Sequence, residues 1–243
     1  YLDRFADLSD FTFIFVGNYD EQQLLDCANR YLANLPKVRR KDRIVDAGVR
    51  LFKGQKLELF RKGESDRSFV SHVTNCGYKA TPKNDMNLNA LTLVLNEKLR
   101  ENIREELSGV YLIYAWPGKE RYPKPSLTFS SMMACSPARV EELNRAIFAT
   151  LDSVRAGYID ERYLVSTKAT LAKTLEEDLR TNYYWLNQIY NIVWQKKPLE
   201  GFLAMPSLVD KIDRKAVAKA AKKYLTFDRN KLSVIMLPAP QNE

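Results

Sequence analysis

The sequence predicts an α+β fold in which a mainly antiparallel sheet is covered by helices. Strand-like groups alternate with helical segments along the chain, and a regular apolar stripe of helical period runs from residue 88 to residue 107. Hydrophobic residues make up 45% of the 243 positions, which is enough for a proper core. Because no internal repeat or low-complexity linker divides these segments, residues 1–243 are expected to form a single α+β domain.

The first ninety residues predict a strand, a helix and then three more strands. Phe11, Phe13 and Phe15 alternate with their neighbours in a strand-like run over residues 11–16. Asp20 is placed to cap a helix that Pro36 ends, with Gln23 three residues later in the capping-box position. Cys27 lies on the apolar stripe of this helix, where a buried thiol is expected. Further strands are predicted at residues 49–52, 56–62 and 68–78.

The second helix has the clearest signals. Thr81 and Pro82 mark its beginning, since proline fits the first helical position. Gly109 is placed to end it in the left-handed conformation. Its apolar stripe consists of Leu88, Leu91, Leu95, Leu99, Ile103 and Leu107. A strand over residues 111–116, closed by Pro117-Gly118, and a returning strand over residues 126–134 are expected to follow.

Helices dominate the remainder. The Ser136-Pro137 pair predicts a helix that Gly157 ends, and Asp160 begins a long helix that reaches Pro198 with a bend at residues 181–182. Asp213 begins another helix that continues to residue 224, and residues 231–237 predict a closing strand.

The net charge of +8 makes nucleic acid and anionic membranes partners to be weighed. The basic residues fall in a loop-like run at 37–43 and on one helix at 215–223, without interleaved aromatic residues, so a solvated surface is favoured and no nucleic-acid partner is expected. No run of about 18 apolar residues is present, and no transmembrane segment is expected. Because the chain begins with Tyr1, it is interpreted as a fragment of a longer multi-domain protein.

The sequence lacks the residue combinations that most known types of catalytic site require. The single histidine, His72, lies inside a strand-like run without a nucleophile motif beside it, so a structural role is favoured. The nine glycines form no phosphate-binding pattern, and the three cysteines form no Cys-x-x-Cys pair. Adjacent carboxylates such as Glu105-Glu106 lie within a helix and are interpreted as a solvated face.

Arg104 and Tyr111 remain as candidate functional residues. They stand seven positions apart across a predicted helix end, where their side chains could reach one bound peptide. By spacing alone the pair is weak evidence, because an exposed helical arginine and a strand tyrosine are commonplace, and a purely structural role for both is favoured. The pattern Arg104, Gly109, Tyr111, however, resembles the non-zinc half of the pitrilysin/insulinase family of metallopeptidases. The opening at residues 15–36 and the ending at residues 212–238 are similar to the same family.

The resemblance implies a fold similar to the mitochondrial-processing-peptidase-like metallohydrolases, built as two halves that close over an unfolded peptide. This chain would be the substrate-binding C-terminal part of a zinc endopeptidase and inactive alone, with zinc held only by the missing N-terminal half, fused or separate. Arg104 would donate to a substrate carbonyl, and the Tyr111 hydroxyl would donate to the oxygen that becomes charged in the transition state. Its likeness to long bacterial members suggests the periplasm or cell envelope. The alternative is a non-catalytic structural or assembly subunit of the same fold.

Overall fold

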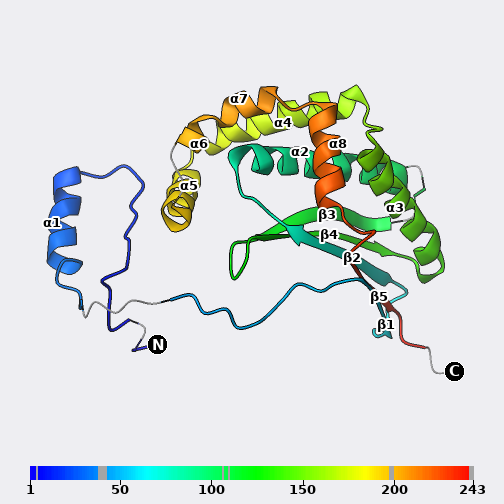
Figure 1. Cartoon of the computed structure of the whole chain (residues 1–243), viewed down its shortest axis with the longest axis horizontal. Helices are drawn as coiled ribbons and strands as arrows, with labels where there is room; N and C mark the ends of the chain where they lie inside the picture. The colour runs from blue at the N-terminus through cyan, green and yellow to red at the C-terminus, as the bar shows by residue number, and fades with distance from the viewer. Residues whose placement is uncertain (4, 38–42, 106, 109, 197–199, 241–243) are drawn as a thin grey trace. The chain divides into compact units, whose positions relative to one another are not determined.

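The computed structural model of the chain describes residues 1–3, 5–37, 43–105, 107–108, 110–196 and 200–240 (Figure 1). The chain folds into two compact units. The smaller unit comprises Tyr1–Val45 and Thr174–Glu200, and the larger unit comprises Asp46–Lys173 and Gly201–Glu243.

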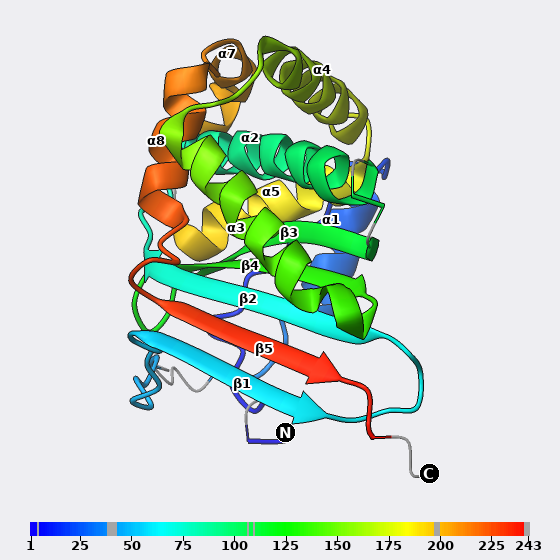
Figure 2. The same cartoon turned by 90° about the vertical axis from the view of Figure 1, so that its right-hand side faces the viewer.

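The larger unit is built on one five-stranded sheet with the strand order β1-β5-β2-β4-β3. The strands are β1 (Gln55–Arg61), β2 (Ser68–Gly77), β3 (Val110–Glu120), β4 (Ser126–Cys135) and β5 (Lys231–Leu237). The β2–β4, β2–β5 and β3–β4 pairs are antiparallel, whereas β1 and β5 run parallel, as Figure 2 shows. The prediction of a mainly antiparallel sheet is confirmed.

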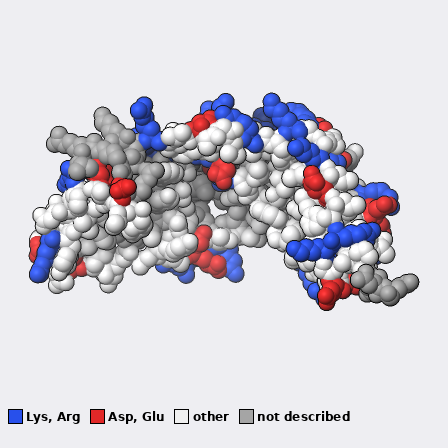
Figure 3. Space-filling view, turned by 90° about the horizontal axis from the view of Figure 1, so that it is seen from below, with Lys and Arg blue, Asp and Glu red and all other residues white. Residues whose placement is uncertain are grey.

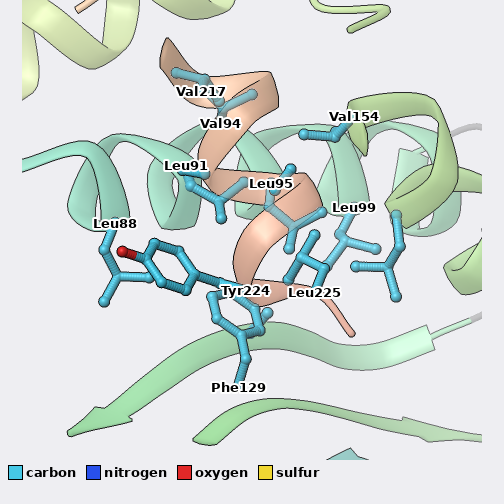
Figure 4. Packing of buried hydrophobic residues seen from close by; sticks show 14 of the residues in the cluster. Leu88, Leu91, Val94, Leu95, Leu99, Phe129, Val154, Val217, Tyr224 and Leu225 are labelled. Carbon is cyan, nitrogen blue, oxygen red and sulfur yellow. The ribbon is translucent and has the colours of Figure 1, made fainter. Parts of the chain in front are cut away.

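Helices cover one face of this sheet (Figures 1 and 2). The covering helices include α2 (Pro82–Leu99), α3 (Val140–Ala156) and α8 (Arg214–Tyr224). The predicted stripe is fully buried within α2, and Figure 4 shows Leu91 and Leu95 packed among Tyr224, Leu225 and Phe129. The unit also contains most of α4 (Glu161–Asp178), and it contains α6 (Glu200–Leu203), α7 (Met205–Asp210) and a short 3-10 turn (Pro137–Arg139).

The smaller unit contains α1 (Glu21–Tyr31), the end of α4 and α5 (Asn182–Gln195). The predicted cap of α1 is confirmed, because the Asp20 carboxylate accepts the backbone N–H of Gln23 at 2.8 Å. In place of the predicted bend, α4 ends at Asp178 and a new helix begins after Thr181, whose hydroxyl accepts the N–H of Tyr184 at 3.2 Å.

Four further local predictions are wrong. Residues 11–16 and 49–52 form no strand, since alternation of side chains does not create a strand unless a neighbouring chain segment pairs with it, and the described residues provide none there. Cys27 is exposed, as α1 buries none of its residues within the described chain. Strand β3 continues past Pro117 to Glu120, because a proline is tolerated on an edge strand. The expected helix stop at Gly109 lies outside the described residues.

Candidate functional site

The end of α2 departs from regular helix where the first candidate residue lies. Residues Arg100–Glu105 continue α2 as a π-helix, and such single π turns occur frequently at functional sites. Within this turn the Ile103 side chain is fully buried and Arg104 is exposed. The Arg104 guanidinium has no hydrogen bond or ion pair among the described residues, so its donors face outward uncommitted.

Strand β3 departs from regular pairing where the second candidate residue lies. Ser108 has a φ of 47°, the left-handed region that non-glycine residues seldom adopt. Val110 then pairs with Cys135 and Leu112 pairs with Ala134, so that Tyr111 is the additional residue of a β-bulge. Bulges are common beside active sites because they redirect a side chain. The Tyr111 side chain is 60% exposed.

Arg104 and Tyr111 line the same open groove, which has a volume of about 390 Å³. One wall comes from α2 and the π-helix, another from the beginning of β3 and a third from α4. Its lining residues are Leu93, Asn96, Glu97, Arg100, Arg104, Tyr111, Leu112, Ile113, Tyr114, Ser166, Thr167 and Thr170. This size is within the usual range for ligand sites.

Three arginines, Arg67, Arg100 and Arg104, lie in or beside the groove. The Arg67 guanidinium carbon lies 4.5 Å from the centroid of the Tyr111 ring, within range of a cation–π interaction. The Arg100 Nε lies 3.9 Å from a Glu105 carboxylate oxygen, but both side chains are about half exposed, so solvent weakens this pair. Arg104 is therefore the arginine of the π-helix whose charge is most available to a bound group.

Three residues near the groove were not singled out from the sequence. Asn96 exchanges two hydrogen bonds with the backbone of Ala115, and the hydroxyl of Thr167 is buried without a hydrogen-bond partner in the described chain. Arg67 reaches Tyr111 from the loop before β2. An asparagine in the middle of a helix is disfavoured, which is the one sequence signal that could have identified Asn96.

A polar cluster neighbours the groove lining. The Tyr163 hydroxyl donates to the Glu101 carboxylate at 2.5 Å, and the Arg162 guanidinium donates to the same oxygen at 2.7 Å. Burial, together with the Glu101 carboxylate, raises the pKa of Tyr163 to about 12. This tyrosine is therefore neutral at physiological pH and holds α4 to the end of α2.

His72 is a structural histidine, as its sequence context favoured, and it does not line the groove. It is 1% exposed, with Nδ1 at 2.8 Å from the Ser233 hydroxyl and Nε2 at 2.9 Å from the Asn144 side-chain oxygen. Since that oxygen can only accept, Nε2 carries the proton and Nδ1 accepts from Ser233. Burial lowers the pKa of His72, so the ring is held neutral.

The described residues contain no group of three His, Cys, Asp or Glu side chains that could hold a metal ion. The groove offers one carboxylate, Glu97, and neither an imidazole nor a thiol, which does not fit zinc. Among the described residues, no helix is long and apolar enough to cross a membrane. On the face drawn in Figure 3, basic side chains are interspersed with acidic ones.

Comparisons with known proteins identify relatives of the chain. The family model for the "Peptidase M16 inactive domain" matches residues 1–171. The chain is similar to the "Probable zinc protease PqqL" of Haemophilus influenzae, with 24% identity over 231 residues that cover 89% of this chain and 24% of the relative. The protein of the same name from Escherichia coli is 25% identical over 238 residues, which cover 96% of this chain and 25% of that protein.

Solved structures share the fold. The periplasmic protease PqqL from Escherichia coli superposes with a TM-score of 0.74 and 22% identity, covering 92% of this chain and 25% of that one. A protease from Helicobacter pylori gives a TM-score of 0.77 with 15% identity, covering 92% of this chain and 54% of that one. The chain thus spans about a quarter of the length of the curated relatives it matches.

Proposed function

Since this chain belongs to the peptidase M16 family, through that family's inactive domain, we propose that it is the substrate-binding part of a zinc-dependent endopeptidase. Zinc would be held by an N-terminal half of the enzyme, fused or separate, and the two parts would enclose a peptide in a closed cavity. By itself the chain would be inactive. The names of the zinc protease relatives support this assignment, and the periplasmic relative supports a location in the periplasm.

The observation that carries the proposal is the convergence of Arg104 and Tyr111 on one groove. They come from different elements, a π-helix and a β-bulge, and both face an open space that would admit a peptide. The π-helix and the β-bulge each interrupt regular backbone hydrogen bonding at the position of one candidate side chain. Such departures are common at functional sites.

The two side chains suit complementary tasks. The Arg104 guanidinium is a permanent cation with several fixed donors, and it would bind a backbone carbonyl of the peptide. The Tyr111 hydroxyl would donate to the oxygen on which negative charge develops when the peptide bond is attacked. Zinc, supplied by the other half, would polarise the scissile carbonyl. This chain would therefore orient the peptide and stabilise the transition state.

The test is hydrolysis of an internally quenched fluorescent peptide by the complete protein, by this fragment alone, and by complete proteins that carry Arg104→Ala or Tyr111→Phe. Removal of a transition-state donor costs about 2.7 to 4 kcal/mol, which corresponds to a loss of about 10²–10³ in kcat. We expect each substitution to lower kcat/KM at least tenfold and the fragment alone to be inactive.

Matched controls are Arg214→Ala and Tyr158→Phe, which change an exposed arginine and a tyrosine that is 74% exposed, both away from the groove lining. Circular dichroism and bound zinc are measured for every variant. Full activity in both test variants would refute the roles of Arg104 and Tyr111. No cleavage by the complete protein across a broad peptide panel would favour the alternative, a non-catalytic structural or assembly subunit.

A further inference from the structure

Strand β3 forms one edge of the sheet and borders the groove. It is 11 residues long and exposes the large apolar side chains of Tyr111, Leu112, Tyr114 and Trp116. A long edge strand with apolar side chains is a template for pairing with another extended chain, and natural proteins cover or interrupt such edges. Whether β3 can bind another chain therefore depends on which of its backbone N–H and C=O groups point away from β4.

Asn96 reveals the direction of those groups. The Ala115 N–H donates to the Asn96 side-chain oxygen at 2.7 Å, and the Asn96 amide nitrogen donates to the Ala115 carbonyl at 2.8 Å. Both backbone groups of Ala115 thus point away from β4, where Ser131 is its register partner. The Asn96 amide occupies this position of the edge as a neighbouring strand would.

In an antiparallel ladder, the direction of the backbone N–H and C=O groups alternates from one residue to the next. Every second residue bonds across to its partner strand, and the residues between them point outward. From Leu112 onward the register of β3 on β4 is regular, so Ile113 and Pro117 point outward as Ala115 does. Pro117 has no N–H to offer. The outward N–H and C=O of Ile113 have no partner among the described residues.

We propose, building on the function above, that an extended peptide adds to the edge of β3 by pairing with Ile113, and that Asn96 ends this pairing at Ala115. The peptide strand is then confined to the stretch beside Arg104 and Tyr111. Asn96 is a positioning residue that fixes the register of the peptide, in steps of two residues, relative to those two side chains. Main-chain pairing of this kind binds peptides with little regard to their sequence.

The opposite wall of the groove fits a peptide strand. Ser166, Thr167 and Thr170 of α4 line it. Small hydroxyl side chains leave room for the peptide side chains that alternate away from β3.

The first test uses the complete protein and the quenched peptide described above, with single backbone N-methyl groups introduced along the peptide. Methylation removes one hydrogen-bond donor at a time. If the peptide pairs with Ile113, kcat/KM falls most at the one peptide position whose N–H donates to the Ile113 carbonyl, and methylation of the neighbouring positions has a smaller effect. A uniform loss along the peptide, or no loss at any position, would overturn the pairing.

The second test places Asn96→Ala and Asn96→Asp in the complete protein, with Asn191→Ala as the control, since Asn191 is an asparagine of α5 that does not line the groove. Alanine frees both backbone groups of Ala115, so the peptide can bind two residues further along. Mass spectrometry is expected to reveal new cleavage products displaced by two residues, amounting to at least a tenth of the total. Unchanged cleavage sites in a folded Asn96→Ala protein would overturn the role of Asn96.

A measurement on the unmutated protein avoids any dependence on variant folding. After zinc is removed with a chelator to stop cleavage, the uncut peptide is added and amide hydrogen exchange is followed at single-residue resolution. The Ile113 amide is expected to exchange at least tenfold more slowly with peptide present, whereas the Ala115 amide, already bonded to Asn96, changes little. Equal exchange of Ile113 with and without bound peptide would overturn the proposal.

The outcomes separate the two proposals. Cleavage that depends on Arg104 and Tyr111, without a position-specific loss among the N-methylated peptides and without displaced products in Asn96→Ala, would remove strand pairing and leave the proposed function intact. Absence of both cleavage and peptide binding in the complete protein would overturn both.

Discussion

The buried histidine gives the sharpest prediction about stability. His72 is held neutral by burial, with its two ring nitrogens committed to Ser233 and Asn144, and Lys231 also acts to lower its pKa. In the unfolded chain the ring would titrate near its ordinary value of about 6.5. Below that pH the unfolded chain binds a proton that the folded chain does not bind. Acidification is therefore expected to destabilise the larger unit through this one side chain.

The size of the effect follows from the difference in bound protons. While the folded ring stays neutral and the unfolded ring is charged, stability falls by at most about 1.4 kcal/mol per pH unit. Between pH 6.5 and pH 5 the contribution of His72 is thus at most about 2 kcal/mol. Above about pH 7.5 both states are neutral and the contribution of His72 to the pH dependence vanishes.

Native-state hydrogen exchange of β2 and β5 amides, in the complete protein between pH 5 and pH 8, measures this dependence. Carboxylates also titrate in acid, so the test is the difference between the unmutated protein and His72→Gln, which cannot bind the proton. The variant is expected to be less stable at pH 8 and to have a shallower slope below pH 6.5. Parallel slopes in the two proteins would refute the reasoning.

Two further substitutions probe the core and a helix end. Leu95→Ala removes a fully buried side chain of α2 and is expected to lower the free energy of unfolding by about 2–5 kcal/mol. The control Leu203→Ala, at an exposed position, is expected to change it by less than about 0.5 kcal/mol. Equal denaturant midpoints for the two variants would contradict this prediction. Gly157→Ala is expected to lower the free energy of unfolding by about 1–2 kcal/mol, because Gly157 ends α3 at a φ of 92°, which an alanine adopts only with strain. The added Cβ itself causes no clash, since it meets only Ala218 at an ordinary 3.8 Å. An unchanged thermal midpoint would show that this backbone strain is relieved elsewhere.

Helix caps and apolar stripes are predicted correctly because their causes are local. Asp20, Thr81 and Asp213 are recognisable as caps from sequence, and each accepts the backbone N–H three residues later. The stripe of α2 is equally clear, since one residue in three or four has to be buried. By contrast, residues 11–16 have the pattern of a strand but no partner in the described chain, and pairing is a property of two segments.

The π-helix and the β-bulge that border the groove could not be predicted from the sequence. Nothing in residues 100–105 distinguishes a π turn from a regular helix, and the bulge at Tyr111 depends on the register against β4. Asn96 has its role only because β3 passes beside α2. The pairing of Arg104 with Tyr111 is singled out by family resemblance, and their chemical roles stay predictions, as does the assignment of residues 1–243 to one domain.

The order of strands in the sheet has a consequence for synthesis of the protein on the ribosome. Among the described residues, strand β1 pairs only with β5, and β5 lies between β1 and β2, although about 170 residues separate β1 from β5 along the chain. Until residues 231–237 have left the ribosome, β1 has nowhere to bind and one side of β2 is open. Nascent chains that stall before this point therefore present two unpaired strands to chaperones and proteases, and the unit can close only when translation has passed β5.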